Sequence, residues 1–145
     1  GKKLAATVLL LDVVKGILPV VLAILLGLDE TWVAATALAA FLGHLFPVFF
    51  QFKGGKGVAT ALGGFLALSP LLAGAILLSW LIVFKISRIS SLSAIIAASL
   101  GPVYSLWLID SINARWIILV IAAMLVARHH GNIKRLLAGE EGQSK

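Results

Sequence analysis

The chain has no cysteine and very little charge. Without cysteine, disulfides, thiolate metal sites and a cysteine nucleophile are all excluded. Asp, Glu, Lys and Arg make up 12% of the 145 residues, which is about half the share typical of a soluble domain. The chain is 61% hydrophobic, and its mean hydropathy is +1.09. Most of its outer surface is therefore expected to face lipid.

Long apolar runs without alternating polar residues predict transmembrane helices. Lipid offers the backbone no hydrogen-bond partners, and these runs are too long for barrel strands. We expect an all-α, polytopic integral membrane helix bundle that forms a single domain over residues 1–145. Six spans are predicted at residues 4–28, 31–50, 58–68, 70–84, 92–109 and 114–127, and a cytoplasmic tail at 128–145.

Basic residues are distributed very unevenly over the loops of this six-span layout. One side receives ten of the twelve: Lys2, Lys3, Lys53, Lys56, Lys85, Arg88, Arg128, Lys134, Arg135 and Lys145. Short cytoplasmic loops collect Lys and Arg, so this side is predicted to be cytoplasmic. The net charge of +6 is then explained by topology, and no nucleic-acid partner is predicted.

Two ionisable residues lie inside the first predicted span. Asp12 and Lys15 are three residues apart, so they share one helical face. An ionisable residue within a span is by default a functional candidate. A self-neutralising pair that orients the helix explains them equally well.

A glycine- and lysine-rich loop follows the second predicted span. It contains Lys53, Gly54, Gly55, Lys56 and Gly57, directly before the next apolar run. Glycines allow the backbone to approach a ligand closely, and free N–H groups at a helix start bind anions. The loop therefore suits a phosphate, although a flexible basic loop is the simpler reading. His44, shortly before it, is interpreted as an interfacial hydrogen-bonding residue.

The tail supplies a second polar cluster. His129 and Asn132 are three residues apart, so a helix that continued beyond the last span would place them on one face. Because histidine exchanges a proton near neutral pH, this cluster is a candidate catalytic site. The alternative is a positively charged anchor in which the histidines are incidental. Alternation of the spans places the glycine-lysine loop, the turn at residues 88–91 and this tail on one face. Such convergence favours an enzyme that acts on a soluble phosphorylated substrate at the membrane surface.

Two long motifs resemble those of the bacterial acyl-phosphate:glycerol-3-phosphate acyltransferases. The first is the run from Gly43 to Thr60, and the second is the run from Arg128 to Leu136 with Glu141 beyond it. The segments at residues 11–16 and 91–93 also fit the family. The resemblance implies a bacterial inner-membrane enzyme that transfers an acyl group from acyl phosphate to the 1-hydroxyl of glycerol 3-phosphate, giving lysophosphatidic acid.

The resemblance also implies roles for particular residues. It assigns the substrate phosphate to Lys53, Gly54, Gly55, Lys56 and Gly57, catalysis to His129 and Asn132, and supporting roles to Ser91, Glu141, Asp12 and Lys15. The expected partners are the two substrates and membrane lipid, and no metal or cofactor is expected.

The family pattern has seven helices, with a Ser/Arg motif upstream of the part that matches this chain. Because the chain opens on Gly1 and its one methionine is Met124, we expect that an N-terminal part is missing. Two other classes of function remain: a small anion or phosphate transporter or channel that uses the same basic loop, and a structural membrane subunit. Transporter sites usually lie near the bilayer midplane, which fits a surface loop less well.

Overall fold

The computed structural model describes residues 1–47 and 55–142, and its regular elements there are all helices, as the sequence predicts. Their bounds are α1 (Lys2–Leu25), α2 (Glu30–Leu45), α3 (Val58–Leu68), α4 (Pro70–Ser87), α5 (Ser90–Leu108), α6 (Ile112–Arg128) and α7 (His130–Leu137).

Polar caps begin three of these helices at the breaks in the apolar pattern. The Asp29 carboxylate accepts the backbone N–H groups of Thr31 and Trp32 at the start of α2. Ser69 and Ser111 each accept a backbone N–H in the first turn of α4 and α6. Such side-chain acceptors satisfy N–H groups that have no partner within the helix. Short polar breaks therefore suffice to separate consecutive helices.

Most predicted boundaries differ from the structure by one to three residues, and the third span, at residues 58–68, agrees at both ends. The second helix ends at Leu45, and Phe46 has φ −126° and ψ 59°, outside the helical region. Phe46 precedes Pro47, whose ring disfavours helical backbone in the residue before it. The predicted end at residue 50 lies outside the described residues. The first helix ends at Leu25, before the positive φ of Gly27.

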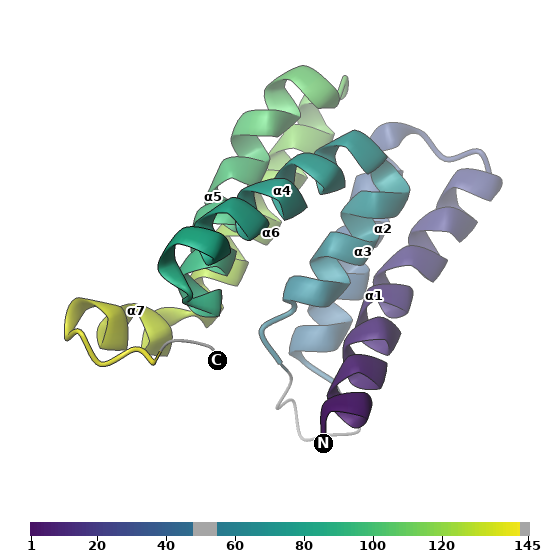
Figure 1. Ribbon diagram of the computed structural model, residues 1–145. Helices are drawn as coiled ribbons and strands as arrows, with labels where there is room; N and C mark the ends of the chain where they lie inside the picture. Colours follow the sequence, from purple (N-terminus) through teal and green to yellow (C-terminus); the bar gives the residue numbers. More distant parts are fainter. Residues whose placement is uncertain (48–54, 143–145) are drawn as a thin grey trace.

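The helices form two neighbouring groups (Figure 1). In one group, α1 packs against α2 and α3; in the other, α5 packs between α4 and α6. Contacts of α2 with α6 and of α3 with α4 join the groups. The larger buried cluster crosses this junction and includes Phe41, Phe65, Leu72 and Ile118.

From α1 to α6, consecutive helices run in opposite directions along the bundle (Figure 1). Figure 1 shows the N-terminus, the start of α3, the end of α4 and α7 at one end of the bundle. At the other end, the Thr31 and Ser111 hydroxyls lie 2.8 Å apart, and the Ser111 N–H donates to Glu30 at 2.6 Å. These contacts tie the connection before α2 to the connection before α6.

The surface of the bundle is strongly apolar. Large side chains that are mostly exposed include Leu10, Leu25, Leu71 and Trp107. Within the described residues, α1, α4 and α5 are each long and apolar enough to cross a membrane, and α6 with α7 would add a span bent by 57°. An integral membrane protein explains this surface, because soluble monomers rarely expose large apolar patches.

Close contact between α1 and α3 depends on glycine. A methyl group on Gly63 would overlap the backbone oxygen of Val13, and one on Gly16 would overlap the backbone oxygen of Thr60. Small residues at such contacts let the backbones of membrane helices approach each other closely. The position of α1 beside the start of α3 is therefore fixed by residues without side chains.

We expect Gly63→Ala to lower the free energy of unfolding by about 1–3 kcal/mol, because the added methyl meets backbone that cannot move aside. Equilibrium unfolding in mixed micelles measures this change. Gly74→Ala is the matched control, since a methyl group there would meet no atom within 4 Å. Equal stability of the two variants would contradict the packing argument.

Candidate active site

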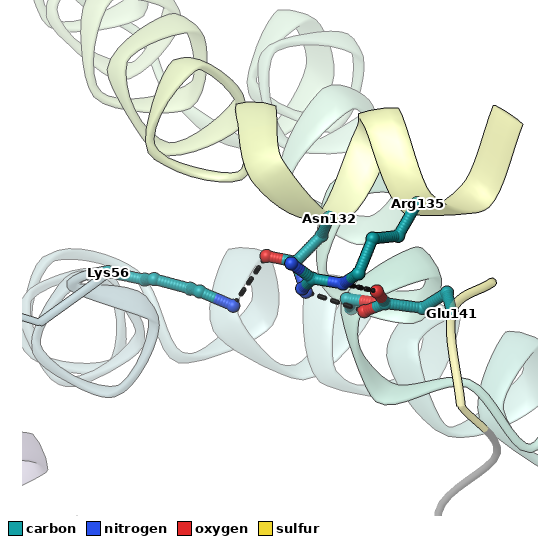
Figure 2. A network of polar contacts seen from close by, with 5 residues as sticks. Lys56, Asn132, Arg135 and Glu141 are labelled. Carbon is teal, nitrogen blue, oxygen red and sulfur yellow. Dashed lines mark hydrogen bonds and ion pairs between the residues drawn. The ribbon is translucent and has the colours of Figure 1, made fainter. Parts of the chain in front are cut away.

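A chain of polar side chains joins three segments that are distant in sequence (Figure 2). The Lys56 ammonium donates to Asn132 Oδ1 at 2.7 Å, and Asn132 Nδ2 donates to Glu141 Oε1 at 2.5 Å. Ser91, in the first turn of α5, donates to the same Glu141 oxygen at 2.5 Å. The structure thus brings together the glycine-lysine loop, the start of α5 and the C-terminal segment.

The start of α3 positions Lys56. Gly57 is the N-terminal cap of α3 and has φ +79°, a left-handed conformation that suits glycine. A side chain on Gly57 would also overlap the ring of Phe41. Beside it, the Arg128 guanidinium donates to the Gly55 carbonyl at 3.1 Å, which holds the loop against the end of α6.

His129 occupies the break between α6 and α7. It is 2% exposed, and its Nδ1 lies 2.8 Å from the Leu125 carbonyl oxygen. Because a carbonyl only accepts hydrogen bonds, Nδ1 carries the proton in the neutral ring, and Nε2 keeps its lone pair. Burial lowers the pKa of His129 below its usual 6.5, and the charge of Lys56 lowers it further, against the raising effects of the Leu125 hydrogen bond and Glu141.

Glu141 is held as a carboxylate. Hydrogen bonds from Ser91, Asn132 and Arg135 lower its pKa to about 2. The Arg135 Nε lies 2.6 Å from the other carboxylate oxygen, Oε2. The carboxylate therefore accepts three donors across the physiological pH range. It fixes the amide of Asn132 so that the oxygen of that amide faces Lys56.

This polar cluster forms one end of a cavity of about 700 Å³. Lys56, Ser91, His129, Asn132 and Glu141 line that end, and the remaining wall is mainly apolar. The apolar wall comes from five helices and includes Val13 of α1, Phe65 of α3, Trp80 of α4, Ala97 of α5 and Ile118 of α6. The cavity therefore suits a molecule with an anionic head and a long hydrocarbon part.

Asp12 and Lys15 lie apart from this network. Asp12 is 3.3 Å from the Lys15 ammonium and 3.5 Å from His44 Nδ1 on α2. A side chain on Gly55 would meet the ring of His44. The pair thus neighbours the loop through His44, while Lys15 is largely exposed. Lys53 and Gly54 lie outside the described residues.

Several partners at the site were missed in the sequence. Arg135 and Arg128 were assigned only to the positive face, yet they bind Glu141 and the Gly55 carbonyl. The sequence predicted a polar tail, in which a helix that continued beyond the last span would place His129 and Asn132 on one face. Instead a bend of 57° separates α6 from a short helix, α7, and turns Asn132 toward Lys56. The helical spacing of the apolar residues Ile133, Leu136 and Leu137, with Lys134 and Arg135 between them, was the available signal for α7. In the described part of the chain, no three His, Asp or Glu side chains gather as a metal ion would need.

We expect Glu141→Gln to lower kcat/KM about tenfold, because a neutral amide accepts charged donors weakly and offers one oxygen instead of two. With a pKa of about 2, the native carboxylate stays ionised at neutral and mildly acidic pH. The ratio of kcat/KM between the variant and the unmodified protein should therefore stay constant from neutral to mildly acidic pH. Glu140→Gln, an exposed neighbour, is the control, and an equal loss there would contradict the role of the network.

Sequence comparison places the chain among known proteins. A model of the glycerol-3-phosphate acyltransferase family matches residues 1–139. A protein named glycerol-3-phosphate acyltransferase from Thioalkalivibrio sulfidiphilus is 54% identical, over 97% of this chain and 70% of the relative. One of the same name from Methylobacillus flagellatus is 53% identical, over 97% of this chain and 72% of the relative.

Solved structures give the same result for the fold. The chain matches PlsY (YgiH), an integral membrane glycerol 3-phosphate acyltransferase, in its glycerol 3-phosphate form. The TM-score is 0.94 at 41% identity, over 100% of this chain and 73% of PlsY. The lysophosphatidic acid form of PlsY matches equally well, with a TM-score of 0.94.

Proposed function

Because the chain belongs to the glycerol-3-phosphate acyltransferase family, we propose that it transfers an acyl group from acyl phosphate to the 1-hydroxyl of glycerol 3-phosphate. The product is lysophosphatidic acid. One observation carries this proposal: a single cavity joins a cationic, hydrogen-bonding end to a long apolar wall. Both substrates have a phosphate, and the acyl donor adds a hydrocarbon chain.

The polar end is the proposed phosphate site. Lys56 supplies a positive charge beside the amide of Asn132. The first residues of α3 and α5 also line the cavity, so the free N–H groups and positive dipole ends of both helices favour an anion there. Gly55 and Gly57 permit this backbone approach, and we extend the phosphate-binding role to Lys53 and Gly54 beside them. The glycerol 3-phosphate form of PlsY supports the choice of ligand.

The apolar wall is the proposed acyl site. Leu9 of α1 and Leu77 of α4 both line the cavity and are both exposed on the lipid-facing surface. Helix α1 packs on α2 and α3, whereas α4 packs on α3 and α5. We propose that the side of the cavity between α1 and α4 opens to lipid, which lets the acyl donor enter from the membrane.

Acyl phosphate is an activated donor, so direct attack by the alcohol needs positioning and charge neutralisation rather than an enzyme nucleophile. The glycerol C1 oxygen bonds to the acyl carbonyl carbon, and the bond from that carbon to the phosphate oxygen breaks. Inorganic phosphate leaves with the bonding electron pair. His129 Nε2 accepts the hydroxyl proton, because Nδ1 is already committed to Leu125. Asn132 orients the phosphate oxygens, with Ser91 and Glu141 in support.

We further propose a six-span arrangement in the bacterial inner membrane, with the active site and the tail at 128–145 on the cytoplasmic face. The positive-inside distribution of Lys and Arg supports this orientation. Asp12 lies near the middle of α1 and contacts His44 in the last turn of α2, and we propose that this contact supports the loop.

The test is acyl transfer from palmitoyl phosphate to radiolabelled glycerol 3-phosphate by the purified chain in liposomes. The full-length Thioalkalivibrio relative serves as the positive control. Radiolabelled lysophosphatidic acid, formed in proportion to inorganic phosphate released, is the expected result. Uptake of phosphate into the liposomes without lysophosphatidic acid would overturn the enzyme proposal in favour of a transporter.

A further inference from the structure

The lining residues on α5 show how far the cavity extends from the polar cluster. Ser91 belongs to that cluster, and Pro102 is the lining residue of α5 farthest from it along the helix. A helical rise of 1.5 Å per residue puts them about 16 Å apart along the helix axis. Half of a bilayer hydrocarbon core is about 15 Å thick. The cavity thus has about the depth that an acyl chain occupies in one membrane leaflet.

Two residues from neighbouring helices meet at this far end. A methyl group built on Gly101 would lie 3.2 Å from Cδ1 and 3.7 Å from Cγ1 of Ile76. The tip of the Ile76 side chain, from α4, therefore rests directly on the bare backbone of Gly101, from α5. Both residues line the cavity, as does the fully buried Ile118 of α6.

We propose that Ile76, seated on Gly101, closes the apolar end of the cavity and sets the longest acyl chain that the enzyme accepts without bending. This inference rests on the proposed acyltransferase function and adds its specificity-determining residues. A side chain on Gly101 would displace the tip of Ile76 from this seat. A donor longer than the cavity must bend out between α1 and α4 into lipid.

The mechanism of selection is steric rather than hydrophobic. Lipid tails are as apolar as the cavity wall, so a methylene group gains little when it moves from the membrane into the cavity. A methylene that meets Ile76, in contrast, forces a displacement of packed side chains. Short donors should therefore react independently of residue 76, and only donors that reach the far end should depend on it.

The experiment tests each protein variant with donors whose chains have 8, 12, 16 or 18 carbons. Initial rates with the acyl phosphates give kcat/KM, and competition by the corresponding alkyl phosphates gives affinity. The kcat/KM of each variant is divided by that of the unmodified protein with the same donor. This ratio cancels the partitioning of the donor into lipid. We expect Ile76→Phe to give a ratio near one for the shortest chain and a fall of about tenfold or more for the longest. Ile76→Ala should raise the ratio for the octadecyl donor.

Matched controls separate this effect from general damage. Leu78→Phe and Leu78→Ala change a neighbouring lipid-facing residue that is 58% exposed. Gly101→Ala, which shifts Ile76 by only a few tenths of an ångström, should act like a mild form of Ile76→Phe, while Gly74→Ala, in open space, should have no effect.

The outcomes distinguish the two proposals. An active enzyme in which Ile76→Phe lowers all chain lengths equally, or none, overturns the chain-length role and leaves the acyltransferase function intact. Absence of product with every donor, while alkyl phosphate affinity still depends on residue 76 at long lengths, overturns the transferase function and supports the cavity end. Absence of both product and alkyl phosphate binding overturns both.

Discussion

Replacing His129 with alanine should lower kcat for acyl transfer about a thousandfold, with little change in KM for glycerol 3-phosphate. A positioned general base typically contributes between about a hundredfold and ten-thousandfold. His129 is buried, its Nδ1 proton is held by the Leu125 carbonyl, and its ring lines the cavity. Nε2 is therefore the ring nitrogen that can accept the proton of the glycerol hydroxyl.

His130→Ala is the matched control for this variant. His130 is the next residue, is exposed, and bonds the backbone of Ala127 through its own Nδ1. It should retain nearly full activity. A rise in KM without a fall in kcat for His129→Ala would show that His129 binds a phosphate and that a substrate phosphate accepts the proton.

The pH profile provides an independent measure of the same group. Burial lowers the pKa of His129 below 6.5, so the ring is neutral and able to accept a proton at pH 7. We expect kcat/KM to stay level as the pH falls to about 6.5 and to decline only below it. The stability of the fold should also decrease at low pH. Below pH 6.5 His129 binds a proton more readily in the unfolded chain than in the folded one, so the free energy of unfolding falls.

The sequence predicted the fold better than it predicted the site. Helix positions were readable because apolar runs, Pro70 and capping residues such as Asp29 are local signals. The gathering of the loop, the turn before α5 and the tail at one end followed from alternation of the spans alone. Direct contacts did not follow, because alternation fixes a face of the membrane and not a distance.

The Lys56 to Asn132 hydrogen bond illustrates this difference. Asn132 follows the bend between α6 and α7, and Lys56 precedes the left-handed Gly57. Neither feature is encoded by the spacing of polar residues. The role of Arg135 could not be predicted either, because the positive-inside rule already explains a basic residue near the cytoplasmic face. Only the fold shows that it bonds Glu141.

Lys56→Met should raise KM for glycerol 3-phosphate by between about tenfold and a hundredfold, with a smaller effect on kcat. A hydrogen bond to a charged group contributes roughly 1.5–3 kcal/mol, and the methionine removes both charge and donor. Initial rates over a range of glycerol 3-phosphate concentrations measure the change. Lys85→Met is the matched control, because Lys85 is exposed in the last turn of α4 and does not line the cavity. An unchanged KM would contradict the phosphate site.

The partner of Lys56 makes this prediction sharper. Since the ammonium donates directly to Asn132 at 2.7 Å, the two side chains should bind the phosphate as a unit. Residues in one hydrogen-bond network show non-additive effects. The double variant Lys56→Met with Asn132→Ala should therefore lose less than the product of the two single losses. Strict multiplicativity would mean that each residue acts on the substrate independently, and the contact would then have no role in binding.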